Sequence, residues 1–271
     1  MSMGLNFLYN TVLGRVILKG LTAPCLSIAV GKFMDSRLSY PIIGPFVKKN
    51  NIDLDECVST DFKSFNDCFT RQLKSQLRPI DMEKENLIAP CDGFLSVWPI
   101  SKDTVLPIKQ SSYTVSDLLG DADLAKKFYD GTCLVYRLCV NHYHRYCYFD
   151  SGVKGDNIFI PGKLHTVRPI ALRNIQVFCE NSREYTVMET ENFGAVAQVE
   201  VGALLVGKIA NHHQTYTYKR GEEKGMFLYG GSTIVVLLEK DAAIVDSDIL
   251  KMSQQGEEYP VRMGEVIGHK C

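Results

Sequence analysis

The chain has 271 residues, of which 45% are apolar and 23% charged, so it is long enough for one large globular domain with a sizeable core. A net charge of -1 and the lack of a basic stripe exclude nucleic acid as an expected partner. The nine cysteines are odd in number and scattered, without a Cys-x-x-Cys pair. This argues against a disulfide framework or a structural zinc site and indicates a reducing compartment. No uncharged apolar stretch reaches 18 residues, so we expect no membrane-spanning helix.

Residues 1–60 are expected to form a helical segment of their own. Residues 5–18 and 26–33 carry apolar side chains at three- and four-residue spacing, with Arg15 and Lys19 breaking the pattern. Two interpretations stay open. The helices pack on the core, or they lie on a membrane surface with their basic residues at the lipid headgroups.

The texture of the sequence changes from helical to strand-like near residue 86. Residues 51–80 are expected to be helical, with a start near Ser59 and Thr60 and an end at Pro79. The later stretches rich in β-branched residues are 134–140, 196–201 and 234–238, and a helical insertion is expected over 115–128, ending near Asp130-Gly131. The pattern predicts an α+β fold in which N-terminal helices precede a mostly antiparallel, β-rich domain of residues 61–271.

Three segments carry residues that are common in active sites. Asp92 lies in the tight turn Ala89-Pro90-Cys91-Asp92-Gly93, just before a predicted strand. His142 and His144 are two residues apart, so on a strand they would point to the same side, but no third and fourth ligand is evident and we predict no metal site. His165 follows the turn Pro161-Gly162-Lys163 and leads into another predicted strand.

A fourth segment, Gly230-Gly231-Ser232-Thr233, interrupts a long apolar run. A small, bent Gly-Ser peptide between two strands is the arrangement that a chain needs to cut itself. Ser232 can attack the carbonyl of Gly231, which has no side chain to block the approach. By itself the same sequence is also common in ordinary hairpins.

Taken together and in this order, these segments resemble the phosphatidylserine decarboxylase family. The matching stretches are Phe62–Pro79 with its Arg-x-Leu and Arg-Pro, Pro90-Cys91-Asp92-Gly93, Tyr143-His144-Arg145, Val201-Gly202-Ala203 with Val206-Gly207, and Gly221–Phe227 leading into Gly230–Thr233. The resemblance runs from about residue 60 to the C-terminus.

The resemblance implies that the chain makes its own cofactor. Ser232, activated by Asp92 and a histidine, would attack Gly231 to form an ester, and elimination followed by hydrolysis would leave a covalent pyruvoyl group at the new terminus. The products would be a large chain, residues 1–231, and a small chain of residues 232–271. The pyruvoyl carbonyl would condense with the amino group of phosphatidylserine and act as the electron sink for loss of carbon dioxide. His144 would then donate the proton that gives phosphatidylethanolamine.

The histidine motif departs from the family pattern at two positions. His142 stands where the family usually has Asp, and Cys147 stands where a second His is usual. A thiol is a poor base toward a serine hydroxyl, because it is mostly protonated at neutral pH. Three alternatives stay open: His144 serves both as the cleavage base and as the proton donor, His165 takes the place of the missing base, or the chain cleaves poorly.

The resemblance also implies a setting for the enzyme: peripheral attachment to the cytoplasmic side of the cell membrane, and a homodimer. Two alternatives remain. One is a pyruvoyl-dependent decarboxylase of a soluble amino acid. The other is a non-enzymatic, β-rich binding module in which Gly230–Thr233 is a plain hairpin and the chain stays whole.

Overall fold

The computed structural model describes residues 7–8, 10–11, 13–14, 16–17, 24–102, 106–108, 111–163, 177–202, 209–229 and 232–271. The helical elements, with η for 3₁₀ helices, are α3 (Pro24–Asp35), η1 (Arg37–Ile42), α4 (Ile43–Lys49), η2 (Leu54–Glu56), α5 (Phe65–Phe69), η3 (Ser75–Leu77), α6 (Val115–Leu119), α7 (Ala122–Ala125), η4 (Lys126–Phe128), α9 (Val177–Glu180) and α10 (Ser247–Gln254). The strands are β1 (Asn86–Ile88), β2 (Gly93–Pro99), β3 (Leu106–Ile108), β4 (Ser111–Tyr113), β5 (Thr132–Leu138), β6 (Arg145–Cys147), β7 (Gly152–Lys154), β8 (Ile158–Ile160), β9 (Arg183–Thr190), β10 (Ala195–Val201), β11 (Ile209–Asn211), β12 (Tyr216–Tyr218), β13 (Glu223–Phe227), β14 (Ser232–Leu238), β15 (Ala243–Val245), β16 (Tyr259–Val261) and β17 (Val266–Lys270).

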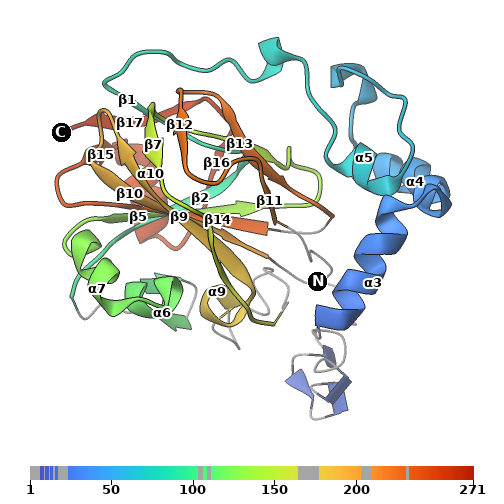
Figure 1. The fold of residues 1–271 in the computed structure, drawn as a ribbon, viewed down its shortest axis with the longest axis horizontal. Helices are drawn as coiled ribbons and strands as arrows, with labels where there is room; N and C mark the ends of the chain where they lie inside the picture. The colour runs from blue at the N-terminus through green and yellow to red at the C-terminus, as the bar shows by residue number, and fades with distance from the viewer. Residues whose placement is uncertain are drawn as a thin grey trace.

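A large antiparallel sheet forms the centre of the molecule (Figure 1). Its strand order is β12-β7-β9-β10-β14-β5-β2-β16, with β8 also paired to β9. The predicted α+β fold with a mostly antiparallel β domain is therefore confirmed. Every residue of β14 is buried, which explains why this strand reads as an unbroken apolar run and not as an alternating one.

Smaller sheets and short helices pack against the central sheet. Two three-stranded sheets have the orders β11-β13-β6 and β1-β17-β15, and β3 pairs with β4. The main apolar core joins central strands to other elements through residues such as Val199, Ile234, Leu118 of α6, Phe227 of β13 and Ile249 of α10. The core therefore includes side chains of β13, the strand that leads toward Ser232, and of β14, the strand that begins with Ser232.

The helices α3, α4 and α5 lie together on one side of the β domain (Figure 1). A separate apolar cluster unites Phe46 of α4 with Phe65 and Phe69 of α5, and it includes Tyr229, which precedes the Gly-Gly-Ser segment. Among the described residues, no helix has the length and apolar character needed to cross a membrane. The N-terminal helices thus contact the β domain close to the segment in which cleavage was predicted.

The continuous helix predicted for residues 51–80 is wrong. The helical parts are the short η2, α5 and η3. The N-cap of α5 is Ser64, whose hydroxyl accepts from Asp67 N in a capping box, rather than Ser59 or Thr60. Extended backbone on both sides of α5 pairs Cys57 with Leu73 in an isolated bridge. This pairing joins residues 16 positions apart, so no local helical pattern could reveal it.

The helical insertion predicted for residues 115–128 is confirmed, although it is broken into α6, α7 and η4. Gly120 ends α6 with a φ of 65°, in the left-handed region that favours glycine. Asp121 then caps α7 by accepting from the backbone N–H groups of Asp123 and Leu124. Capping at these two adjacent positions is what divides the segment.

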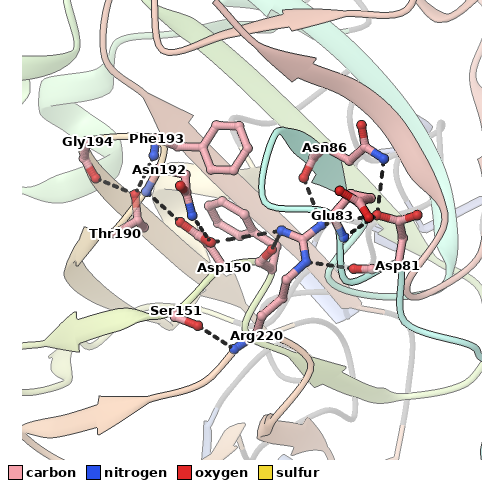
Figure 2. Close-up of polar contacts among 11 residues, drawn as sticks. Asp81, Glu83, Asn86, Asp150, Ser151, Thr190, Asn192, Phe193, Gly194 and Arg220 are labelled. Atoms are coloured by element: carbon pink, nitrogen blue, oxygen red, sulfur yellow. Dashed lines mark hydrogen bonds and ion pairs between the residues drawn. The ribbon is translucent and has the colours of Figure 1, made fainter.

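The buried Arg220 connects the segment before β1 with the segment after β6 (Figure 2). Its guanidinium donates to the carbonyls of Asp81 at 2.7 Å, Asn86 at 2.8 Å and Phe149 at 2.8 Å. Asp150, which is 2% exposed, lies 3.9 Å from the same guanidinium. Charge-assisted hydrogen bonds of this kind are among the strongest in proteins. Arg220 therefore fixes the segment before β1 against the segment that follows β6.

Candidate active site

Ser232 is the first residue of β14, and it is completely buried. It pairs with Leu138 of β5, while the next residue, Thr233, pairs with Val201 of β10. The Ser232 hydroxyl has no hydrogen-bond partner among the described residues. Gly231 and the preceding glycine lie outside the described residues. A buried hydroxyl without a partner is unfavourable, and such groups are frequent at catalytic sites.

His144 is also completely buried, and its tautomer follows from its one hydrogen bond. Nδ1 lies 2.9 Å from the carbonyl oxygen of His142. A carbonyl only accepts, so Nδ1 must carry the hydrogen and Nε2 must hold the free lone pair. Nε2 has no partner within the described part of the chain. Burial lowers the pKa of His144 to about 3, so the imidazole is neutral at physiological pH. Such an imidazole is a proton acceptor at Nε2.

His144 lies in a loop before β6, so the prediction that it and His142 share one face of a strand is wrong. The His142 ring turns back, and its Nδ1 accepts from Cys139 N at 3.2 Å, which the strand assumption could not foresee. The His144 ring packs on Phe69 of α5 with centroids 4.1 Å apart. The backbone carbonyl of His144 accepts from Phe227 N of β13. His144 is therefore held between α5 and the strand that leads toward Ser232.

Asp92 is buried in an ion pair that the sequence analysis did not identify. Its carboxylate accepts from Arg78 Nε at 2.6 Å and Nη2 at 2.5 Å, and also from Met263 N at 3.0 Å. Within the described residues these contacts, not one to His144, orient the carboxylate. The signal was present, because Arg78 belongs to the Arg-Pro pair quoted for the family resemblance. The function of the pair was invisible, because it joins residues 14 positions apart.

Cys147, which stands where the family usually has its second histidine, is buried in β6. Burial raises the pKa of its thiol to about 12, so the thiol is protonated at neutral pH. It cannot serve as the base for Ser232. His165 is therefore the remaining candidate for the role of the second histidine.

His165 lies outside the described residues, but the chain is described as far as Lys163. Lys163 N donates to the Glu180 carbonyl, and the neighbouring Asn181 donates from Nδ2 to the Gly202 carbonyl at 2.6 Å. Gly202 directly follows Val201, the residue that pairs with Thr233. The chain thus reaches Lys163 beside the end of β10 that adjoins Ser232.

A cavity of about 490 Å³ lies beside Asp92, and its described lining does not include Ser232 or His144. Its lining includes Asp92 and His142 together with Arg71, Arg78 and Arg262. Arg71 is 6% exposed, and its Nη2 donates to the Asn141 carbonyl at 3.1 Å. Its Nε has no partner among the described residues, so this buried cation is incompletely compensated. Carboxylates of Asp53, Glu56 and Glu265 also line the cavity, which therefore presents both signs of charge.

Comparison with known proteins identifies the family. The family model for phosphatidylserine decarboxylase matches residues 65–269. The chain belongs to the phosphatidylserine decarboxylase family. It is 45% identical over 265 residues to phosphatidylserine decarboxylase proenzyme 2 of Clostridium acetobutylicum, covering 97% of this chain and 91% of that protein. It is 41% identical over 275 residues to the phosphatidylserine decarboxylase proenzyme of Clostridium perfringens, covering 98% and 92%. The corresponding proenzyme of Ruminiclostridium cellulolyticum is 42% identical over 274 residues, covering 98% and 90%.

Membership of the phosphatidylserine decarboxylase family confirms the resemblance drawn from the motifs. It also confirms the prediction of an enzyme of this family, and it favours neither the amino acid decarboxylase nor the binding module. The matched region includes Asp92, His144 and Ser232 as well as α5. The relatives are named proenzymes, which agrees with a chain that is processed after synthesis.

Proposed function

We propose that this protein cuts itself between Gly231 and Ser232 and then decarboxylates phosphatidylserine to phosphatidylethanolamine. One observation carries the proposal. In a member of this family, the Ser232 hydroxyl and the His144 Nε2 are both fully buried and both without a hydrogen-bond partner among the described residues. Nucleophile and base positions of this kind are stable only when the surrounding fold compensates their cost.

In the cleavage step, the residues act on one peptide bond. A histidine accepts the Ser232 proton, and Oγ attacks the Gly231 carbonyl as the peptide rearranges to an ester. Elimination then releases the Gly231 carboxylate, and water replaces the former amine of residue 232 with release of ammonia. The structure supports His144 as the acceptor through its unprotonated Nε2. His165 remains the second candidate.

The buried position of Ser232 fits the pyruvoyl group that this cleavage would leave there. A small keto-acyl group needs a site that excludes water, and the first residue of β14 is 0% exposed. The pyruvoyl group would supply the electron sink for the decarboxylation. This chain's residues would bind the headgroup and orient it, and His144, once its Nε2 has taken up a proton, is the proposed donor to the substrate carbon.

The cavity beside Asp92 suits the polar headgroup of a phospholipid. A serine phosphodiester carries an ammonium group and two anionic groups, and the cavity offers carboxylates together with Arg71 and Arg262. Arg71, with its unsatisfied Nε, supports the binding of an anionic group. Assembly as a homodimer remains a prediction.

The N-terminal helices support peripheral binding to the cytoplasmic side of the cell membrane. Three large apolar side chains are exposed on α3 and η1: Phe33 at 41%, Leu38 at 77% and Tyr40 at 58%. Arg37 is exposed on η1, and Lys48 and Lys49 are exposed on the following helix, α4. Apolar side chains combined with basic residues favour the surface of an anionic bilayer.

Membrane docking predicts a selective effect of charge on this surface. The double substitution Phe33→Glu with Leu38→Glu is expected to weaken co-sedimentation with phosphatidylserine vesicles by roughly tenfold or more, because apolar contact is lost and like charge is added. Ile244→Glu is the matched control, since Ile244 is 50% exposed on β15, on the opposite side of Figure 1 from α3. Equal loss of binding in both proteins would contradict docking through α3 and η1.

The proposed activity is tested by the choice of substrate. Purified protein is expected to release carbon dioxide from phosphatidylserine vesicles but not from free serine, with phosphatidylethanolamine appearing in equal amount. Carbon dioxide from the free amino acid alone would indicate the soluble amino acid decarboxylase. An uncleaved protein inactive on both would indicate the binding module.

A further inference from the structure

Asn66 of α5 joins the cleavage segment to the N-terminal helix α3. Its Oδ1 accepts from the backbone N–H of Tyr229 at 3.1 Å, and its Nδ2 donates to Asp35 Oδ1 at 2.7 Å. A carboxylate only accepts, so the Asp35 contact fixes the amide with its oxygen toward Tyr229. Asn66 is 5% exposed and Asp35 is exposed, so the two hydrogen bonds are partly buried. No motif in the sequence had singled out this residue.

Aromatic contacts strengthen the same connection. The Tyr229 ring packs edge-on against Phe65 at 4.8 Å and against Phe69 at 5.5 Å between centroids. Phe69 in turn packs on the His144 ring at 4.1 Å. One short helix, α5, therefore contacts both the residue that precedes the Gly-Gly segment and the histidine proposed as the base.

The position of Tyr229 makes this contact relevant to cleavage. Only Gly230 and Gly231 separate it from Ser232, which is fixed in β14 by pairing with Leu138. Glycines have no side chains to anchor them, and two residues span at most about 7 Å. Attack on a carbonyl requires the reacting atoms to lie about 3–3.5 Å apart in a defined orientation. Whatever holds Tyr229 and Ser232 therefore constrains the short peptide that joins them.

We propose that Asn66 is a positioning residue for self-cleavage, and that its pairing with Asp35 makes α3 part of the cleavage apparatus. The inference rests on the proposed cleavage between Gly231 and Ser232. Asn66 touches neither reacting atom, and it acts through the Tyr229 N–H. After cleavage the same bond holds the third residue from the new C-terminus of the large chain beside α5.

A charge-relief experiment tests this role. Asn66→Asp places a second carboxylate against Asp35, so we expect the cleavage rate to fall by roughly tenfold or more. Adding Asp35→Asn restores a donor for the new carboxylate, whose other oxygen can accept from Tyr229 N–H. The double variant is expected to return to within about threefold of the unmodified rate. Asp35→Asn alone retains an acceptor for Asn66 Nδ2 and is expected to cleave normally.

The measurement is a time course of chain cleavage on denaturing gels after cell-free synthesis of the full chain. Asn50→Ala is the matched control, because it removes a side-chain amide that, among the described residues, donates to Phe46 O of the neighbouring helix α4. Thermal unfolding of each variant in a Ser232→Ala background reports folding separately. An unchanged rate in Asn66→Asp, or a double variant as slow as the single, would overturn the inference. Failure of the unmodified chain to cleave would instead overturn the proposed function.

Discussion

Ser232→Ala is expected to yield a single intact chain with no decarboxylase activity. The substitution removes the hydroxyl that we propose attacks the Gly231 carbonyl, and the strand β14 should be undisturbed because the hydroxyl has no partner among the described residues. The unmodified protein is expected to separate into residues 1–231 and a small chain of forty residues, 232–271. Intact-mass measurement distinguishes these products from a whole chain of 30.4 kDa.

Ser96→Ala is the matched control for this substitution. Ser96 is a buried serine of β2 in the same central sheet, at 7% exposure, and it is remote from the cleavage segment in sequence. It is expected to cleave normally. Two chains from Ser232→Ala would show that another bond is cut. A whole unmodified chain with an ordinary serine at position 232 would remove the basis of the decarboxylation.

His144→Ala is expected to lower decarboxylation by at least about 100-fold, the usual contribution of a positioned acid or base. This holds whether His144 serves cleavage and proton donation or proton donation alone. Gels of His144→Ala and His165→Ala then identify the cleavage base as the histidine whose loss leaves one band. His269→Ala, at an exposed histidine on β17, is the control. Cleavage in both test variants would contradict a histidine base.

The pH dependence of cleavage tests His144 as the cleavage base without a substitution. A base works only when it is unprotonated, and burial lowers the pKa of His144 to about 3. If His144 is the base, the cleavage rate should stay level as the pH falls from about 8 to 5. A histidine with an ordinary pKa near 6.5 would lose roughly tenfold in rate per pH unit below that value. A falling rate would therefore contradict His144 as the base.

The relation between local pattern and tertiary contact is clearest around His144. The motif Tyr143-His144-Arg145 identified the residue, and the poor basicity expected of Cys147 agrees with a thiol pKa raised to about 12. The strand geometry assumed for the motif was wrong. The loop conformation depends on the His142 carbonyl and on Phe69, which lies 75 positions earlier in the chain. Sequence spacing holds no information about a contact over that distance.

Asp92 shows the same difference between what a local pattern predicts and what a tertiary contact decides. The turn before β2 identified Asp92, but its partner Arg78 became evident only in three dimensions. Asn66 was not identified at all, because a buried asparagine in a five-residue helix has no distinctive local pattern. Its importance arises from one backbone N–H that lies 163 positions away.

The order of motifs along the chain determined the family and the position of Ser232, because a Gly-Gly-Ser segment between apolar runs is a local feature. The sequence also determined the α+β class, because burial gives each strand its own local pattern of apolar residues. Tertiary structure decided that Ser232 is buried at the start of β14, that Arg78 pairs with Asp92 and that α5 holds Tyr229. Those outcomes depend on contacts between distant segments, which form only when the central sheet and the α5 cluster pack together.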